Sequence, residues 1–262
     1  MPELPDLEVF KDNIFKRLTS KRLVGLNVFS QKITTPQVVL MEELKDRDLL
    51  GIGRCGKELL FDFADGRIIS AHLMLSGRIS IVGAADTADK IKSKVFSLNF
   101  ENERVIFHDA GKIGVVIRYK PKPDNVPDAL GDDFTLGCFL KAARKKYGVN
   151  IKAFLIDQKV VKGIGNAYAD EILWAARVSP KSLIGKIPEE AMTALYKAVG
   201  DVLRAAVVSI KTIAPDIISG EERSFLKVHN SFKKETETGF PIIAEVIVSK
   251  MTYYTDEQTV YA

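Results

Sequence analysis

Apolar residues first recur with a helical period and then with the period of strands. Residues 4–19 predict a helix with one apolar face, formed by Leu7, Phe10, Ile14 and Leu18. Short β-rich runs follow at 22–29, 57–73, 77–82, 94–109 and 113–119. Asp65-Gly66 and Glu101-Asn102-Glu103 are predicted to form hairpin turns. Several strands at this spacing favour a sandwich or barrel over alternating βαβ units.

The second half of the chain returns to a helical pattern after a proline-rich stretch. Residues 120–131 hold three prolines in twelve positions and predict a linker. Four helices are predicted beyond it, at 134–148, 151–161, 166–178 and 188–211. The tail from 225 to 262 has strand-like runs that predict one hairpin.

Composition places the chain among ordinary globular proteins. Its 262 residues are 46% hydrophobic and 27% charged, which excludes a disordered or collagen-like chain. No apolar run approaches the ~20 residues of a membrane helix, and the N-terminus lacks a signal-peptide pattern. Two cysteines and three scattered histidines favour neither a zinc site nor a disulfide framework, so we expect reduced thiols and a cytoplasmic location. The net charge of +4 is compatible with a polyanionic partner but is weak evidence alone.

The first candidate chemistry lies at the N-terminus. If Met1 is removed, Pro2 presents a free secondary amine that is followed directly by Glu3. An N-terminal amine is less basic than a lysine, so more of it is neutral and able to attack a sugar C1′ or an aldehyde. A neighbouring carboxylic acid can move the protons. The alternative is that the prolines only stiffen the end of the chain.

A second candidate is the turn between two predicted helices. The segment Lys162-Gly163-Ile164-Gly165-Asn166 permits a tight turn, whose amides and following helix N-terminus would form a phosphate site. Asn166 is expected to cap that helix or to donate to a phosphate, and Lys162 adds charge. A plain helix–turn–helix corner fits the spacing equally well. A third feature is Gly56-Lys57 at the rim of a strand, where a lysine is normally a solvated surface charge.

Taken together, these motifs resemble the formamidopyrimidine-DNA glycosylase / endonuclease VIII family. MPELPDLEV, GKELLFDF and HLMLSGRI are similar to family signatures, and LIDQKVVKGIGNAYADEILWAARVSP resembles the helix–two-turns–helix motif. The resemblance implies an α+β fold, with an N-terminal helix plus two-layer β-sandwich and then a helical domain ending in a β-hairpin finger. The expected divisions are a catalytic sandwich domain at 1–120, a linker at 121–131, a DNA-binding helical domain at 132–224 and the finger at 225–262.

The resemblance also implies base-excision repair of damaged DNA, duplex or single-stranded. The Pro2 amine would form a Schiff base at C1′ with Glu3 as acid/base, and β- and δ-elimination would break the strand. Lys57 matches a lysine with proton-donor and phosphate-contact roles, and Asn166 an asparagine that grips phosphates. The predicted DNA-binding set is Lys57, His72, Met74, Lys112, Ile113, Lys146, Lys162, Gly165, Asn166 and Lys250. We expect a monomer with no cofactor, no metal and no membrane contact, associated with the nucleoid if the source is bacterial.

The finger departs from the family pattern. Its four usual cysteine positions align with Glu235, Thr238, Thr255 and Gln258, which predicts a finger without zinc. We expect packing to hold it, through Phe232, Phe240, Ile242, Val246, Val248, Tyr253 and Tyr254. Lys250 stands where the family places an arginine, and its loss of the bidentate fork predicts weaker δ-elimination.

The wedge that fills the gap left by a flipped base departs too. The family's DPRRFG reads here as residues 109–114, with Gly111 and Ile113 in place of arginine and phenylalanine. This predicts weak discrimination of the opposite base, with Met74 or Leu75 as the remaining filler. The sequence leaves the lesion open, because recognition is expected in the loop at 214–224. Two other readings stay open: a catalytically reduced DNA-damage-binding protein of the same fold, and a generic sandwich-plus-helices protein.

Overall fold

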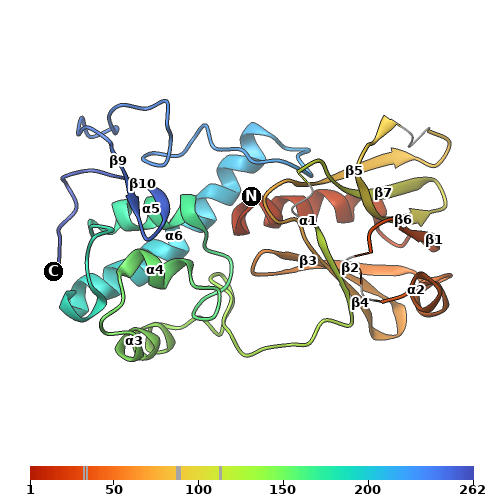
Figure 1. Ribbon diagram of the computed structural model, residues 1–262, viewed down its shortest axis with the longest axis horizontal. Helices are drawn as coiled ribbons and strands as arrows, with labels where there is room; N and C mark the ends of the chain where they lie inside the picture. Colours follow the sequence, from red (N-terminus) through yellow and green to blue (C-terminus); the bar gives the residue numbers. More distant parts are fainter. Residues whose placement is uncertain (32, 34, 87–89, 112–113) are drawn as a thin grey trace. The chain divides into compact units, whose positions relative to one another are not determined.

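The computed structural model describes residues 1–31, 33, 35–86, 90–111 and 114–262. The chain forms two compact units, which we call the sandwich unit and the helical unit (Figure 1). The sandwich unit contains Met1–Pro2, Asp6–Asp124 and Ala214–Glu221. The helical unit contains Glu3–Pro5, Asn125–Ile213 and Glu222–Ala262. Glu3–Pro5 and Ala214–Glu221 therefore belong to a different unit from the residues next to them in sequence. The linker at 121–131 and the boundary of the finger at 225 stay predictions.

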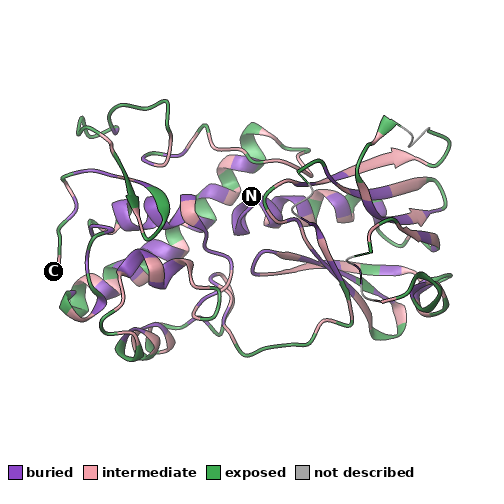
Figure 2. Ribbon diagram, in the orientation of Figure 1, coloured by how far each residue is buried: buried purple, intermediate pink, exposed green. Residues whose placement is uncertain are grey.

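Two antiparallel four-stranded sheets form the sandwich unit. One has the strand order β1 (Leu23–Val28), β6 (Lys94–Phe100), β7 (Glu103–Asp109) and β5 (Gly77–Gly83). The other has the order β2 (Leu49–Cys55), β3 (Glu58–Phe63), β4 (Arg67–His72) and β8 (Val116–Tyr119). Both sheets and α1 (Leu4–Leu18) contribute to one core, in which Phe61 of β3 meets Phe107 of β7 edge to face at 5.8 Å. Figure 2 shows the first half of α1 as buried. The predicted helix and sandwich are confirmed.

Turn chemistry explains the hairpins of this unit. The turn between β3 and β4 is Ala64–Gly66, one residue longer than predicted, and Asp65 and Gly66 in it both have positive φ, which lets a short loop reverse the chain between twisted strands. The hairpin between β6 and β7 is shorter than predicted, because Glu103 already pairs with Gly83 as the first residue of β7. The sequence pattern missed β2 and the helix α2 (Gln37–Leu44). In β2, Gly51 and Gly53 interrupt the apolar alternation, and α2 has little more than two turns in which a period can show.

Four helices form the helical unit, as predicted: α3 (Leu136–Lys145), α4 (Ile151–Ile156), α5 (Asn166–Ala175) and α6 (Glu189–Ile213). Their apolar faces share one core with Leu4, Leu226 and a short 3₁₀ turn at Ile184–Lys186. The tail forms the predicted hairpin from β9 (Ile243–Ile247) and β10 (Lys250–Tyr254). No described helix is both long and apolar enough to cross a membrane.

Helix α4 ends five residues earlier than predicted because polar side chains bind the backbone after it. The Asp157 carboxylate accepts the N–H of Lys159 at 3.0 Å. Gln158 accepts the N–H of Gly163 and donates to the carbonyl of Ile164. These bonds replace helical ones and produce the two turns that lead into α5.

Candidate functional site

The carboxylate of Glu3 occupies the N-terminus of α5. It accepts hydrogen bonds from the backbone N–H groups of Gly165 at 2.8 Å, Ala167 at 3.1 Å and Tyr168 at 3.4 Å. Glu3 is only 4% exposed. The positive end of the helix and its unpaired amides both favour an anion at this place. The residue after Pro2 is therefore fixed to the helical unit by its side chain.

Two glycines allow this close approach. A Cβ on Gly165 would lie 2.2 Å from Cδ of Glu3, and one on Gly163 would lie 2.5 Å from Cδ1 of Leu4. Gly163 also has a φ of +103°, which side chains rarely adopt. In the structure the amide of Gly165 and two amides of the first turn of α5 bind Glu3, and the phosphate site predicted at this turn stays a prediction.

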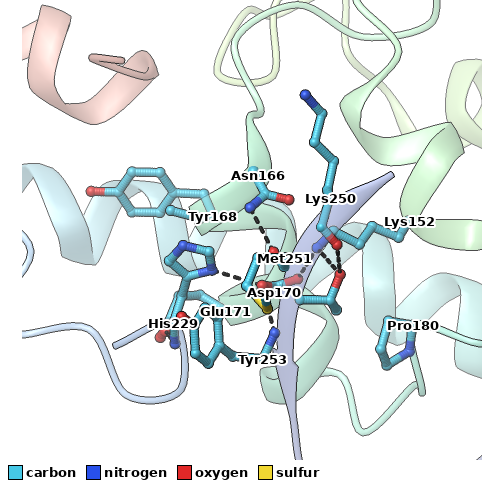
Figure 3. Close-up of polar contacts among 12 residues, drawn as sticks. Lys152, Asn166, Tyr168, Asp170, Glu171, Pro180, His229, Lys250, Met251 and Tyr253 are labelled. Carbon is cyan, nitrogen blue, oxygen red and sulfur yellow. Dashed lines mark hydrogen bonds and ion pairs between the residues drawn. The ribbon is translucent and has the colours of Figure 1, made fainter. Parts of the chain in front are cut away.

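Asn166 connects the start of α5 with the hairpin. Its Nδ2 donates to the carbonyl of Met251 at 2.8 Å (Figure 3). The predicted capping role is wrong, because Gly165 is the N-cap residue and the caps come from Glu3. Among the described residues, Oδ1 of Asn166 is a buried atom with no hydrogen-bond partner. Its contact with phosphate stays a prediction.

A buried chain of charged side chains, which sequence reasoning missed, lies beneath this turn. Nζ of Lys152 lies 2.7 Å from Oδ1 of Asp170 and donates to the Thr252 hydroxyl at 2.6 Å. Oδ2 of Asp170 lies 2.7 Å from Nδ1 of His229 and accepts the N–H of Tyr253 at 3.0 Å (Figure 3). Burial lowers the pKa of Lys152, and Asp170 offsets part of this effect. One sequence signal was present, since Lys152 falls on the apolar face of its helix.

Lys250 begins β10 and is exposed. It follows a two-residue turn in which Val248 and Ser249 have φ of 51° and 59°. Such turns favour Asn and Gly, and a β-branched residue in this conformation is strained. The strained turn therefore places Lys250 at the tip of the hairpin, while Asn166 binds the next residue. Figure 3 shows the Lys250 side chain pointing away from Lys152.

The sandwich unit contributes its own cluster of predicted site residues. Lys57 is 8% exposed in a two-residue hairpin whose first residue, Gly56, has a φ of 58°. It is therefore not the solvated surface charge that is usual at a strand rim. The side chain of His72 accepts the N–H of Met74 through Nδ1 at 3.0 Å. Burial lowers the pKa of His72, as do Lys57 and Arg118, against an opposing effect of Glu58, and this favours the neutral ring. Because Nδ1 accepts from Met74, the proton of the neutral ring lies on Nε2.

The two candidate fillers lie next to this cluster. Met74 has a φ of 54°, a strained conformation for a side chain of its size, and Leu75 is 56% exposed. The Met1 ammonium in the same unit pairs with Glu221.

Asp109 anchors the loop that replaces the family wedge. It accepts hydrogen bonds from the Ser76 hydroxyl and from the backbone N–H groups of Gly111 and Gly114. Burial raises the pKa of Asp109, but these bonds outweigh it and hold the pKa below its ordinary value. A Cβ on Gly111 would lie 2.3 Å from Oγ of Ser76, so the anchored loop has no room for a side chain there. Lys112 and Ile113 lie outside the described residues.

The two other predicted lysines have partners of their own in the helical unit. Lys146, just after α3, forms an ion pair with Asp157 at 3.2 Å. The backbone of Lys162 pairs with two residues of the predicted linker. Its N–H donates to the carbonyl of Pro127, and its carbonyl accepts the N–H of Ala129. Their DNA contacts stay predictions.

The four aligned cysteine positions do not fit a zinc ion. The N–H of Thr255 donates to Oε1 of Gln258 at 2.9 Å, and Nε2 of Gln258 donates to the carbonyl of Val178 at 2.9 Å. Nearby, the Thr236 and Thr238 hydroxyls are 2.8 Å apart. The described residues contain no group of three or more metal-binding side chains. Amide and hydroxyl groups are poor zinc ligands and already have partners here.

A carboxylate, Glu257, is the centre of this finger. It accepts hydrogen bonds from Trp174 and from the Thr255 hydroxyl, each at 3.1 Å, and pairs with Arg177 at 3.0 Å. Burial raises the pKa of Glu257, but bonds from Thr238, Trp174 and Thr255 and the charge of Arg177 hold it below its ordinary value. The predicted apolar packing is wrong for most of its members: Phe232 is 94% and Val246 63% exposed, whereas Tyr254 is buried. A hairpin with so little apolar area needs polar partners instead.

Known proteins match the chain over most of its length. Residues 1–116 match the formamidopyrimidine-DNA glycosylase N-terminal domain, and residues 126–215 match the H2TH domain of the same family. A formamidopyrimidine-DNA glycosylase from Carboxydothermus hydrogenoformans is 31% identical over 227 residues, 85% of this chain and 84% of the relative. One from Pelotomaculum thermopropionicum is 28% identical over 272 residues, 97% of each chain.

Solved structures show the same fold. The Lactococcus lactis enzyme in complex with abasic-site DNA has a TM-score of 0.86 at 22% identity, covering 98% of this chain and 100% of that one. Its complex with DNA containing an oxidised pyrimidine gives the same TM-score. This chain has a sandwich, a helix–two-turns–helix unit and a hairpin, which together place it in the class of base-excision DNA glycosylases. Within that class, the chain belongs to the formamidopyrimidine-DNA glycosylase family.

Proposed function

We propose that this protein is a bifunctional DNA glycosylase and AP lyase that uses Pro2 as its nucleophile. Once Met1 is removed, the neutral Pro2 nitrogen bonds to C1′ of a damaged nucleotide, and the bond from C1′ to the base breaks. The base leaves with that electron pair and takes up a proton. The nitrogen lone pair then forms the Schiff base as the C1′–O4′ bond breaks and O4′ takes up a proton, which opens the sugar ring. The Schiff base makes the C2′ proton acidic, so removal of that proton breaks the C3′–O3′ bond and expels the 3′ phosphate by β-elimination.

The position of Glu3 is the observation that supports this proposal most strongly. Three backbone N–H groups and two glycines fix its carboxylate one residue away from Pro2. Pro2 has a short tether to a fixed point, which restricts its amine to a small region. In this proposal the Glu3 carboxyl moves the protons of base departure and elimination.

Other residues serve the phosphates and the later steps. In the sandwich unit, we propose that Lys57 and the Nε2–H of neutral His72 contact DNA phosphates. Lys250, at the hairpin tip, contacts a phosphate near the lesion and assists δ-elimination. Because lysine lacks the bidentate fork of arginine, Lys250→Arg should raise the share of δ-elimination product relative to β-elimination product.

Borohydride trapping tests the nucleophile. The reagent reduces a Schiff base to a stable amine, so an oligonucleotide with an abasic site should become covalently linked to the wild-type protein. Pro2→Gly should lose most of this adduct, whereas Pro5→Ala, a matched change three residues on, should keep it. Failure of the wild-type protein to form an adduct would favour the alternative, a DNA-damage-binding protein without catalysis.

We also propose weak reading of the base opposite the lesion, and activity on single strands. Gly111 has no side chain with which to read that base, and its position beside Ser76, held by Asp109, leaves no room for one. Excision rates should differ by less than about threefold between opposite cytosine and opposite adenine, since no bidentate contact discriminates between them. A preference of tenfold or more would contradict this. The proposed partner is damaged DNA, bound by a cytoplasmic, nucleoid-associated monomer without a cofactor.

A further inference from the structure

A hollow of about 480 Å³ opens on the helical unit, away from the contacts of Glu3. We call it the His229 hollow; its walls come from residues 223–224 and 229–232 and from Tyr253 of β10. None of these lining residues is acidic. Its size falls in the range of about 300–1,000 Å³ that is usual for ligand sites.

His229 is held rigidly in the wall of this hollow. Asp170 binds its Nδ1 at 2.7 Å, and the ring meets Tyr253 edge to face at 4.8 Å. The backbone around it is fixed as well, because Glu171 accepts the N–H groups of Val228 and His229. Within the described part of the chain, Nε2 of His229 has no hydrogen-bond partner. Because the Asp170 carboxylate only accepts, Nδ1 carries the ring proton, and Nε2 is left to accept a hydrogen bond from a ligand.

A cation and an aromatic ring complete the site. The Arg223 guanidinium lies 5.1 Å from the centre of the Tyr168 ring, which limits its freedom. Phe232 is 94% exposed, and Lys233 and Lys234 follow it. Asn230 fixes the loop by accepting the N–H of Phe232 at 3.0 Å. An exposed aromatic ring between basic groups is typical of single-strand binding, where bases stack on such rings.

We propose that the His229 hollow is a nucleotide subsite, occupied by a nucleotide of the DNA strand that flanks the lesion. Phe232 stacks on the base and Arg223 contacts the adjoining phosphate, while His229 lines the hollow with Nε2 as a hydrogen-bond acceptor. The inference rests on the proposed function, because it requires DNA as the ligand. It explains how the protein holds a single strand although its wedge lacks a side chain at Gly111.

Binding of a single-stranded oligonucleotide with a tetrahydrofuran abasic analogue tests the subsite. Phe232→Ala should weaken binding about tenfold, since base stacking on aromatic rings is worth roughly 1–3 kcal/mol per base. Phe232→Trp should restore it. The matched control is Phe240→Ala, which removes another exposed phenylalanine of the same unit and should leave affinity unchanged. Thermal unfolding should be the same for all three variants as for wild type.

Salt dependence and fluorescence separate stacking from charge. The slope of log affinity against log salt should be unchanged in Phe232→Ala and should fall by about one in Arg223→Gln. With 2-aminopurine placed next to the analogue, quenching by the wild-type protein should occur at one flanking position and be lost in Phe232→Ala.

The outcomes distinguish the two proposals. If wild type is trapped by borohydride but Phe232→Ala binds as wild type does, the subsite is wrong and the enzyme stands. If the wild-type protein is not trapped, the proposed chemistry fails, and the affinity of Phe232→Ala still decides on the subsite.

Discussion

The N-terminus of α5 and the finger both depend on a carboxylate, but they hold it differently. At α5, Glu3 is bound by three backbone N–H groups, and glycines at 163 and 165 make room for it. In the finger, Glu257 is bound by side chains, among them Trp174, Arg177 and Thr255. The first site depends on the backbone and tolerates no added Cβ, whereas the second is a set of replaceable partners.

This difference fits the roles that we assign to the two regions. A site that positions a nucleophile needs a fixed geometry, and backbone donors supply it without side-chain freedom. A finger that holds a hairpin can replace metal ligands by hydrogen bonds, provided that each buried polar group finds a partner.

The largest effect should come from closing the space at α5. In Gly165→Ala the added Cβ would meet Glu3 at 2.2 Å and displace its carboxylate. Trapping rates should fall by about 100-fold, as a shift of the order of 1 Å costs in positioned catalysis. Gly148→Ala, where nothing lies within 4 Å, is the control. Near-normal trapping by Gly165→Ala would show that Glu3 need not be held by α5.

The next effect concerns the buried chain that joins α4 to β10. Lys152→Met leaves Asp170 without its ion pair, so the free energy of unfolding should fall by about 3–5 kcal/mol. Denaturant unfolding measures it, with Lys159→Met as the exposed control. A loss below about 1 kcal/mol would mean that His229 and Tyr253 alone satisfy Asp170.

Removing the carboxylate of the finger should cost less. Glu257→Ala takes the acceptor from Trp174 and Thr255 and should lower stability by about 1–3 kcal/mol. Because its folded pKa lies below the ordinary 4.5, Glu257 stabilises the protein above about pH 4.5 and loses this effect as the pH falls through the folded pKa. Wild type should therefore lose stability faster than Glu257→Ala on acidification. Parallel curves would contradict the role of this charge.

The smallest effect should be a gain. Val248→Asn with Ser249→Gly supplies the residues that positive φ favours and should stabilise the hairpin by about 0.5–1 kcal/mol. Hydrogen exchange of the β9 and β10 amides measures it. Val246→Asn on an extended, exposed strand position is the control and should give no gain. Faster exchange in the double variant would mean that the turn is not strained.

The sequence predicted the backbone-determined parts of the molecule well. The helix at 4–19, the sandwich strands and the four later helices follow from apolar period, and the resemblance pointed to Glu3 and Gly165. It did not predict which anion the α5 amides bind, because Glu3 is 162 residues from Gly165 and no local pattern links them. The partners of Asp170 and Glu257 were missed for the same reason. Phe232 was misassigned to packing because an apolar residue in a strand-like tail carries no mark of exposure.

The most direct test of the central claim is to locate the trapped sugar by tandem mass spectrometry. Borohydride-reduced complexes with abasic DNA would be digested with nuclease and protease, and the modified peptide sequenced. The account predicts a chain without Met1 that carries the deoxyribose remnant on the nitrogen of Pro2. A remnant on Lys57 or Lys250, or an active protein that retains Met1, would contradict it.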